Sequence, residues 1–231
     1  MIISVVGGGG KTTVGCKIAY ELSRKGWRTL FTTTTKIFHP GKGSVYIGPV
    51  QYLTADNLLL TAAKAQLPHG KLLGYTPDEM AQLPPLFDCI ITEADGSARK
   101  PVKAPNETEP VYPLHTKIVI GVIGLDCLGK PITDEFVHRA DLFADVTESN
   151  AGDIITEQHW LRLIKHPKGL FKGAPQEARK IVFLNKSDLI HASVKNEINK
   201  TLEKSAVPVL FTSREEAWFT EFYVWMKEGE I

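Results

Sequence analysis

The strongest constraint on the fold of this chain lies at its N-terminus, where an apolar, β-branched run at residues 2–6 leads into a glycine turn. The turn and the residues after it are Gly7, Gly8, Gly9, Gly10, Lys11, Thr12 and Thr13, and a helical pattern follows at once. Glycines let the backbone turn tightly and direct its amides inward, while a helix N-terminus and a lysine attract anions. The order of strand, glycines and helix predicts a P-loop whose amides hold a phosphate chain, with Thr12 as a Mg²⁺ ligand.

The spacing of this loop departs from the usual one, in which a glycine, four residues and then Gly-Lys-Ser/Thr follow one another. Counting back from Gly10, Val5 occupies the position of the first glycine. A glycine turn without a ligand is the alternative interpretation, but the complete order of strand, glycines, Lys-Thr and helix favours phosphate binding. The short loop therefore argues against hydrolysis of the nucleotide but not against its binding.

Hydrophobic periodicity predicts an α/β chain. An apolar stripe at helical spacing marks a helix over residues 11–25, and a β-rich run marks a strand over residues 28–33. Further strands are expected at residues 44–48, 86–92, 117–123, 180–184 and 207–211. Further helices are expected at residues 54–65, from Thr76-Pro77, at 133–142, 156–164 and 189–204, and up to residue 227. This alternation predicts a three-layer, doubly wound, mainly parallel sheet of the P-loop NTPase-like class, since parallel strands need helical crossovers. We expect one domain over residues 1–231, with excursions at about 39–85 and 97–115.

Composition sets limits on the class of protein. The 231 residues carry a formal net charge of +1, which gives no broad field for nucleic acid or a membrane surface. The 3 cysteines are widely spaced and form no Cys-x-x-Cys pair, which argues against structural zinc and for a reducing compartment. No signal-peptide pattern or membrane-length apolar run is recognised, so a cytoplasmic protein is expected.

A second candidate site element is Glu93-Ala94-Asp95-Gly96, at the end of the predicted strand 86–92. A carboxylate here would bind Mg²⁺ through water or orient the attacking water opposite Lys11 and Thr12. Asp95 is the first choice for this role, as a metal ligand and with Lys11 as a catalytic residue, and Glu93 is the second. The alternative is an ordinary Asp-Gly turn.

A third element predicts the base. Asn185-Lys186-Ser187-Asp188 follows a strand, as the guanine-reading Asn-Lys-x-Asp turn of P-loop GTPases does. The Asp188 carboxylate would accept hydrogen bonds that adenine does not offer. Ser213, after the last strand, is expected to contribute a second base-contacting loop. Alternatively Ser187-Asp188 only caps the next helix, which leaves ATP open.

The irregular stretch 97–113 contains four prolines and several basic side chains. Arg99, Lys100 and Lys103 are candidates to bind an anionic substrate, against the alternative of a solvated loop. Thr35 is a further candidate near the terminal phosphate, although a Thr-rich strand explains it as well. The pair His138-Arg139 is interpreted as the surface of a helix.

The chain carries, in this order, the motifs VGGGGKTT, ITEADGSARKPVKAP, EPVYP, VIGLDCLGKPI, VHR and LNKSD. These motifs extend along nearly the whole chain and resemble those of the YqeC-type accessory proteins of selenium-dependent molybdenum hydroxylases. The resemblance implies a P-loop protein linked to the maturation of molybdenum-containing hydroxylases. It transfers functional positions to residues 7–13, 93–96, Lys100, Lys103 and 185–188. Two positions depart from the expected pattern: Thr108 stands where a histidine is expected before Glu-Pro, and Val6 lies where some P-loop relatives carry an extra lysine.

These features lead to one expected function and two alternatives. We expect Mg²⁺-dependent purine nucleotide binding, with GTP favoured over ATP, and slow hydrolysis that serves hydroxylase maturation. The expected partners are the nucleotide and a molybdenum hydroxylase or its cofactor precursor, with no nucleic acid and no membrane. The alternatives are a kinase or nucleotidyltransferase acting on a cofactor precursor, and a non-hydrolysing scaffold that keeps its nucleotide bound.

Overall fold

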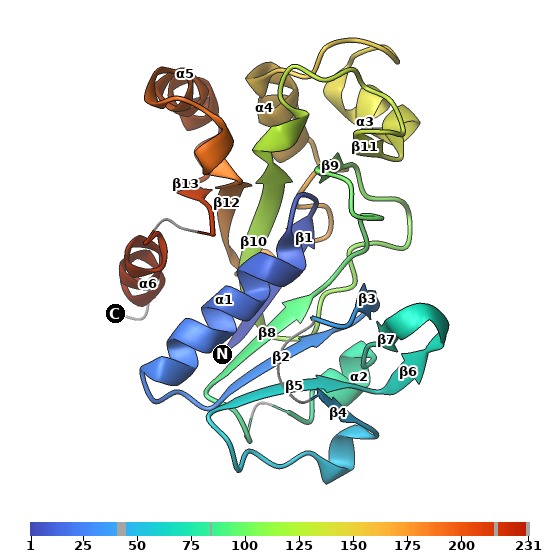
Figure 1. Ribbon diagram of the computed structural model, residues 1–231, viewed down its shortest axis with the longest axis vertical. Helices are drawn as coiled ribbons and strands as arrows, with labels where there is room; N and C mark the ends of the chain where they lie inside the picture. Colours follow the sequence, from blue (N-terminus) through green and yellow to red (C-terminus); the bar gives the residue numbers. More distant parts are fainter. Residues whose placement is uncertain (41–44, 84, 215–216, 230–231) are drawn as a thin grey trace.

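The computed structural model describes residues 1–40, 45–83, 85–214 and 217–229, and its centre is a parallel sheet (Figure 1). Within these residues the sheet has eight strands, in the spatial order β13 (Val209–Thr212), β12 (Arg179–Asn185), β10 (Thr116–Gly124), β1 (Ile2–Gly7), β8 (Cys89–Glu93), β2 (Thr29–Thr33), β5 (Leu59–Ala63) and β4 (Val45–Ile47). Every neighbouring pair is parallel. The predicted α/β class is therefore confirmed, with the P-loop strand β1 between β10 and β8.

Helices cover both faces of this sheet. They are α1 (Lys11–Arg24), α2 (Pro77–Met80), α3 (Ala140–Thr147), α4 (Glu157–Lys165), α5 (Ala192–Leu202) and α6 (Phe219–Lys227). Short 3-10 turns are η1 (Val50–Tyr52), η2 (Pro68–Gly70), η3 (Leu125–Cys127), η4 (Ser187–Leu189) and η5 (Glu203–Ser205). In the described part of the chain no helix is both long and apolar enough to cross a membrane.

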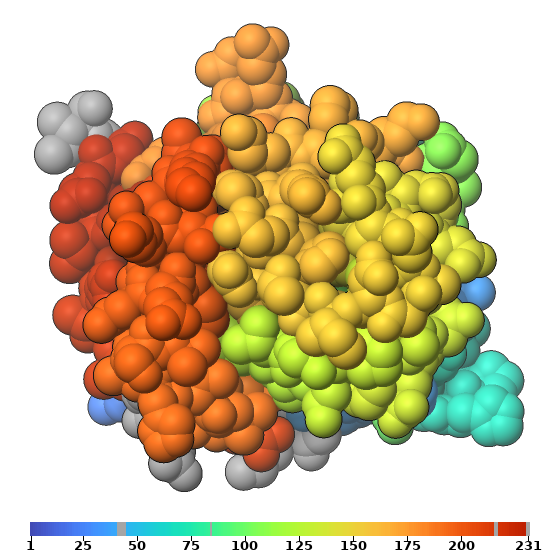
Figure 2. Space-filling model, turned by 90° about the horizontal axis from the view of Figure 1, so that it is seen from above, coloured from blue at the N-terminus to red at the C-terminus, as the bar shows by residue number. Residues whose placement is uncertain are grey.

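The alternation of side chains along β1 explains the three layers. Ile3 and Val5 pack against α1 and α6 on one face, whereas Ile2 and Val6 belong to hydrophobic clusters on the other. A strand buried on both faces has this continuous apolar character, because its side chains alternate between the two layers. Over the strands on one side of β1, the second face is covered by α3, α4 and α5, which Figure 2 shows lying side by side.

Two small sheets lie outside the central one. An antiparallel sheet joins β3 (Lys36–Phe38), β7 (Lys71–Leu73) and β6 (Ala65–Leu67), and a two-stranded sheet joins β9 (Val102–Lys103) and β11 (Val137–His138). The predicted excursion at 39–85 is therefore only partly separate from the core. Its segments β4 and β5 extend the central sheet, while β6 and β7 form the antiparallel sheet with β3.

The helix predicted at residues 54–65 is wrong, because β5 occupies this segment. The strand pairs with β2 and β4, so the open edge of β2 supplied backbone partners that outweighed the helical spacing of the leucines. Thr54, the first residue of the predicted helix, donates through its hydroxyl to Asp56 at 2.6 Å. Of the strand predicted at 44–48, residues 45–47 form β4 and residue 44 lies outside the described residues.

The helix predicted at 133–142 is also wrong over most of its length. Val137 and His138 form β11 against β9, and Arg139 has a left-handed backbone with a φ of 63° immediately before α3. His138-Arg139 is therefore not a pair on a helix surface. Two other predicted helices begin where they were expected, because α2 follows Thr76 and α4 follows Thr156. Each of these threonines forms a capping box.

Candidate functional site

The glycine loop between β1 and α1 is closely surrounded by backbone. Gly7, Gly9 and Gly10 have φ values of 95°, 77° and 119°, which side-chain-bearing residues rarely adopt. A Cβ atom would collide with the carbonyl of Val122 at Gly7, with the backbone of Gly124 at Gly9 and with the Asn185 amide at Gly10. Packing alone therefore requires these glycines, whether or not a ligand binds.

Hydrogen bonds within the loop decide which amides remain for an anion. The amide of Gly7 donates to Asp95 Oδ2 at 3.0 Å, that of Gly8 to the Val122 carbonyl at 2.9 Å and that of Gly9 to the Lys100 carbonyl at 2.9 Å. The amides of residues 10–13 have no acceptor among the described residues, because the first turn of a helix has none within the helix and Gly10 supplies no side-chain cap. The amides of Gly7, Gly8 and Gly9 are thus already paired, and those of residues 10–13 remain without an acceptor in the described part of the chain.

Lys11 is folded back into the protein beneath this loop. Its Nζ donates to the Gly7 carbonyl at 2.8 Å and lies 3.3 Å from Glu93 Oε1 and 3.3 Å from Asp95 Oδ1. Burial by itself lowers the pKa of Lys11, but the two carboxylates outweigh it, and the pKa is raised. The lysine is therefore a buried cation, held by two carboxylates from the end of β8.

Glu93 lies next to the predicted Mg²⁺ ligand Thr12. The Thr12 hydroxyl donates to Glu93 Oε2 at 2.7 Å, and both residues line a cavity of about 540 Å³ in front of the loop. Burial raises the pKa of Glu93, although Lys11 and the bond from Thr12 oppose the shift. The Thr12 hydroxyl in the first turn of α1 and the Glu93 carboxylate at the end of β8 are oxygen donors of the kind that Mg²⁺ takes beside nucleotide phosphates, so this pair fits the metal.

Asp95, the first-choice metal ligand, is placed differently. It is only 1% exposed and is not among the residues lining the cavity. Its oxygens accept from the Gly7 amide and lie 3.3 Å from Lys11 and 3.2 Å from Lys103. The structure thus brings Thr12 to Glu93 and leaves Asp95 as the counter-charge of two lysines. Within the described ranges no group of three or more His, Cys, Asp and Glu side chains forms a separate metal site.

Lys103 continues a chain of alternating charges rather than facing a substrate. Its buried Nζ lies 2.7 Å from Glu109 Oε2 and donates to the Gly96 carbonyl at 2.6 Å. Glu109 in turn accepts from Arg139 at 2.9 Å and from the Gly96 amide at 3.2 Å. This network fixes the long loop against the strand end. Glu109 was not predicted as a site residue, and Arg139 was interpreted as part of a helix surface, although the EPVYP and VHR motifs contain these two residues.

The Asn-Lys-Ser-Asp turn lies directly beside the glycine loop. Asn185, the last residue of β12, donates to the Gly9 carbonyl at 2.7 Å and accepts from Thr212 at 3.2 Å. Lys186 has a φ of 65°, and its ammonium pairs with Asp126, another residue that the sequence analysis did not single out. Asp126 lies in the sequence LDC just after the strand predicted at 117–123, and this position at a strand end could have indicated it.

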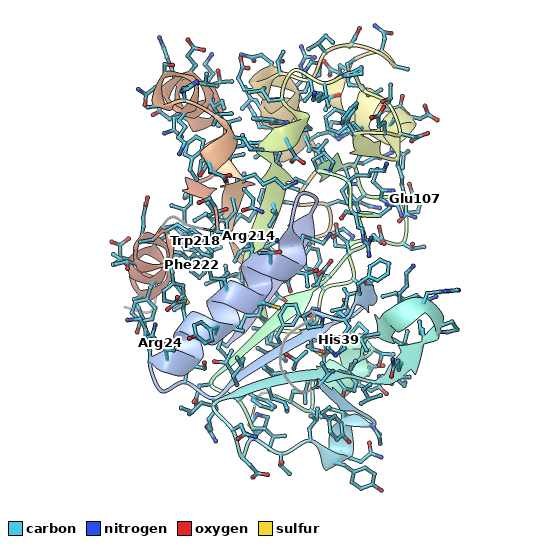
Figure 3. All side chains as sticks on the ribbon, in the orientation of Figure 1. Arg24, His39, Glu107, Arg214, Trp218 and Phe222 are labelled. Carbon is cyan, nitrogen blue, oxygen red and sulfur yellow. The ribbon has the colours of Figure 1, made fainter. Side chains whose placement is uncertain are left out.

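Two cavities connect this turn to the helix N-terminus. Asp188 lines one of about 310 Å³ together with Gly10, Thr13 and Arg214. Ser213 lines the neighbouring one, of about 470 Å³, with Thr12, Thr13 and Trp218. Arg214 and Trp218 are labelled beside α1 in Figure 3. The predicted base-side residues therefore border the same space as the free amides.

Of the four predicted substrate residues, only Arg99 lines the 540 Å³ cavity. Lys100 donates to the Glu135 carbonyl at 3.0 Å, and the Thr35 carbonyl accepts from the Gly74 amide at 2.8 Å. Lys186, predicted as part of the base-reading turn, also lines this cavity. The other basic residues at the cavity were not predicted as site residues, and they are Lys36, His39, Lys71 and His138.

Comparison with known proteins agrees with the resemblance seen in the motifs. The family model described as "YqeC protein" matches residues 3–141. The "Uncharacterized protein YqeC" of Escherichia coli (strain K12) is 35% identical over 224 residues, which cover 91% of this chain and 86% of that protein. No solved structure matches this chain. The family match spans the glycine loop, the two carboxylates at the end of β8 and the long loop with Glu109, and the chain belongs to the YqeC family.

Proposed function

We propose that this protein binds a purine nucleotide with Mg²⁺, prefers GTP and hydrolyses it slowly. The observation that carries the proposal is the bond from Asn185 to the Gly9 carbonyl. It places a turn with the residue pattern of a guanine reader beside a helix N-terminus with free amides. A nucleotide could therefore bind its phosphates to the amides of residues 10–13 and its base to the neighbouring region near Asp188.

Residues of this chain divide the binding tasks between the two ends of the site. The amides of residues 10–13 would bind phosphate oxygens, and Lys11 would turn from Glu93 and Asp95 toward the terminal phosphates. Thr12 and Glu93 would hold Mg²⁺, which supplies positive charge to the phosphate oxygens when bound. Asp188 would accept hydrogen bonds from the guanine edge, and Ser213 lies at the neighbouring cavity.

Slow hydrolysis is proposed because the lysine begins in an ion pair that it must leave. The 3.3 Å contacts to both carboxylates have to be exchanged for contacts to phosphate, and Glu93 is the carboxylate that borders the cavity and is available to orient a water. A kinase or nucleotidyltransferase is the second candidate, favoured by the basic side chains of Lys36, Lys71 and Arg99 across the same cavity. Service to a molybdenum hydroxylase stays a prediction from the family resemblance.

Titration calorimetry with Mg²⁺ and the diphosphates GDP and ADP tests the binding proposal. Wild-type protein is expected to bind GDP more tightly, and Lys11→Ala is expected to lose binding of both nucleotides. Lys200→Ala, an exposed lysine of α5, serves as the matched control and should behave as wild type. Unchanged affinity in Lys11→Ala, with a folded protein by circular dichroism, would refute the phosphate site.

A further inference from the structure

The wall of the 540 Å³ cavity that faces Thr12 and Glu93 is basic. Lys36 comes from β3, Lys71 from β7 and Arg99 from the loop after β8, and all three line this cavity. We call these three side chains the basic wall. They come from three separate segments, so the tertiary fold gathers them at one place.

The small antiparallel sheet explains how two members of the wall share a face. Phe38 of β3 is paired with Lys71 of β7, so the two side chains stand opposite each other on one face. Lys36 lies two residues before Phe38 and therefore projects on the same side. This sheet presents two lysines and an aromatic ring to the cavity.

The third member is held over the same ring. The guanidinium of Arg99 lies 4.0 Å from the centroid of Phe38, and the Lys71 ammonium lies 5.3 Å from it. Ala98 and Arg99 have φ values of 47° and 63°, a left-handed conformation that costs free energy in residues with a side chain. The loop therefore has an unfavourable backbone conformation at the residue whose side chain contributes to the basic wall.

The basic wall has no acidic partners. Among the residues that the structure describes, Lys36, Lys71 and Arg99 form no ion pair, whereas Lys11, Lys103 and Lys186 at the same end of the sheet each do. Three cations that line one wall of a cavity and form no ion pair among the described residues suit a multiply charged anion, because Arg binds a phosphate through two parallel bonds and the lysines add charge.

We propose that the basic wall binds a second substrate, a small molecule that carries a phosphate monoester, next to the terminal phosphate of the nucleotide. The inference rests on the proposed nucleotide site, in which residues 10–13 and Asp188 would bind the nucleotide on the other side of Thr12. The phosphate group would lie between Arg99 and Lys71. The rest of the molecule would extend along the cavity toward Glu93.

Equilibrium dialysis with radiolabelled inorganic phosphate tests this assignment on the full chain. The nucleotide site is first saturated with Mg²⁺ and a non-hydrolysable GTP analogue, so that the helix N-terminus is occupied. Wild-type protein is expected to bind phosphate under these conditions. Arg99→Glu and Lys71→Glu should each weaken phosphate binding at least about tenfold, while Lys200→Glu should match wild type.

Nucleotide affinity measured on the same variants separates the two proposals. Arg99→Glu and Lys71→Glu are expected to keep the affinity for the analogue within about twofold of wild type. Equal losses of analogue and phosphate would overturn the inference, since the wall would then belong to the nucleotide site. Absence of phosphate binding in wild type would overturn it as well. Phosphate binding that depends on Arg99 in a protein that binds no nucleotide would refute only the nucleotide site.

Discussion

The side-chain amide of Asn185 donates a 2.7 Å hydrogen bond to the carbonyl of Gly9 and so joins the turn after β12 to the loop after β1. Its oxygen accepts from Thr212 at the end of β13. One buried amide therefore connects three strand ends. The bond from Asn185 to the Gly9 carbonyl holds the predicted base end of the site against its predicted phosphate end.

Removal of this amide is expected to loosen the whole site. Asn185→Ala leaves the Gly9 carbonyl and the Thr212 hydroxyl unsatisfied, which should cost about 1–3 kcal/mol of unfolding free energy. Urea denaturation measures the loss, and Asn196→Ala, on an exposed position of α5, is the control. Equal stabilities of the two variants would show that the bond contributes nothing.

Base preference is predicted to depend on Asp188. Asp188→Asn removes the charged acceptor for the guanine N–H groups and should weaken GTP binding about 10–100-fold, with a much smaller effect on ATP. Calorimetry with both nucleotides gives the comparison, and Asp145→Asn on the exposed side of α3 is the control. Parallel losses for GTP and ATP would contradict the guanine assignment and leave Asp188 as a helix cap.

The parts of the fold that could be predicted are those decided by nearby residues. The strands β1, β8, β10 and β12 are continuous apolar runs, because parallel strands covered on both faces bury every side chain. The segment of β5 was misread because its conformation depends on the free edge of β2. Val137 and His138 were misread for the same reason, since β9 supplies their partner from a distant loop.

The residues of the candidate site likewise fall into those that local sequence predicts and those that depend on distant contacts. The glycine loop, Glu93 and the turn at Asn185 each lie where one strand ends, so the sequence order located them. The ion pairs among Lys103, Glu109 and Arg139 join segments that are distant in the sequence. No local sequence pattern predicts such contacts. That Glu93 rather than Asp95 accepts the bond from the Thr12 hydroxyl likewise depends on how α1 lies against the end of β8.

Neutral substitutions of the two carboxylates at the end of β8, Glu93 and Asp95, are expected to affect different properties of the protein, namely its Mg²⁺ dependence and its stability. Asp95→Asn removes one of the two counter-charges of buried Lys11 and also one of the two of buried Lys103, and should lower the unfolding free energy by about 3–5 kcal/mol. Glu93→Gln should cost less, since burial already raises the pKa of Glu93 and Lys11 keeps its bond to Asp95. Its main effect should be a weaker dependence of nucleotide affinity on Mg²⁺.

Chemical denaturation and calorimetry at several Mg²⁺ concentrations distinguish these variants, with Asp145→Asn again as the control. The reverse pattern would return the metal role to Asp95: a stable Asp95→Asn protein that has lost its Mg²⁺ dependence, beside a Glu93→Gln protein that keeps it.

Stability in acid is predicted to depend on Glu109. Burial alone raises the pKa of this carboxyl, but the bonds from Lys103 and Arg139 outweigh it and hold the pKa below the ordinary value of 4.5. The unfolded chain therefore takes up the proton first, so this stabilisation is present above pH 4.5 and is lost as the pH falls through the folded-state pKa. Glu109→Gln should be less stable than wild type near neutral pH and should converge with it in acid.

Urea denaturation at a series of pH values from about 3 to 7 tests this convergence, since the window includes the unfolded-state pKa of the carboxyl. Glu107→Gln is the matched control, because Glu107 lies in the same loop, its side chain is 94% exposed and its nearest cation, Lys172, is 4.0 Å away. Figure 3 labels Glu107 at the edge of the molecule. The control should follow wild type at every pH. A constant difference between wild type and Glu109→Gln across the series would mean that the charge of Glu109 contributes no stability, and that its loop is held by packing alone.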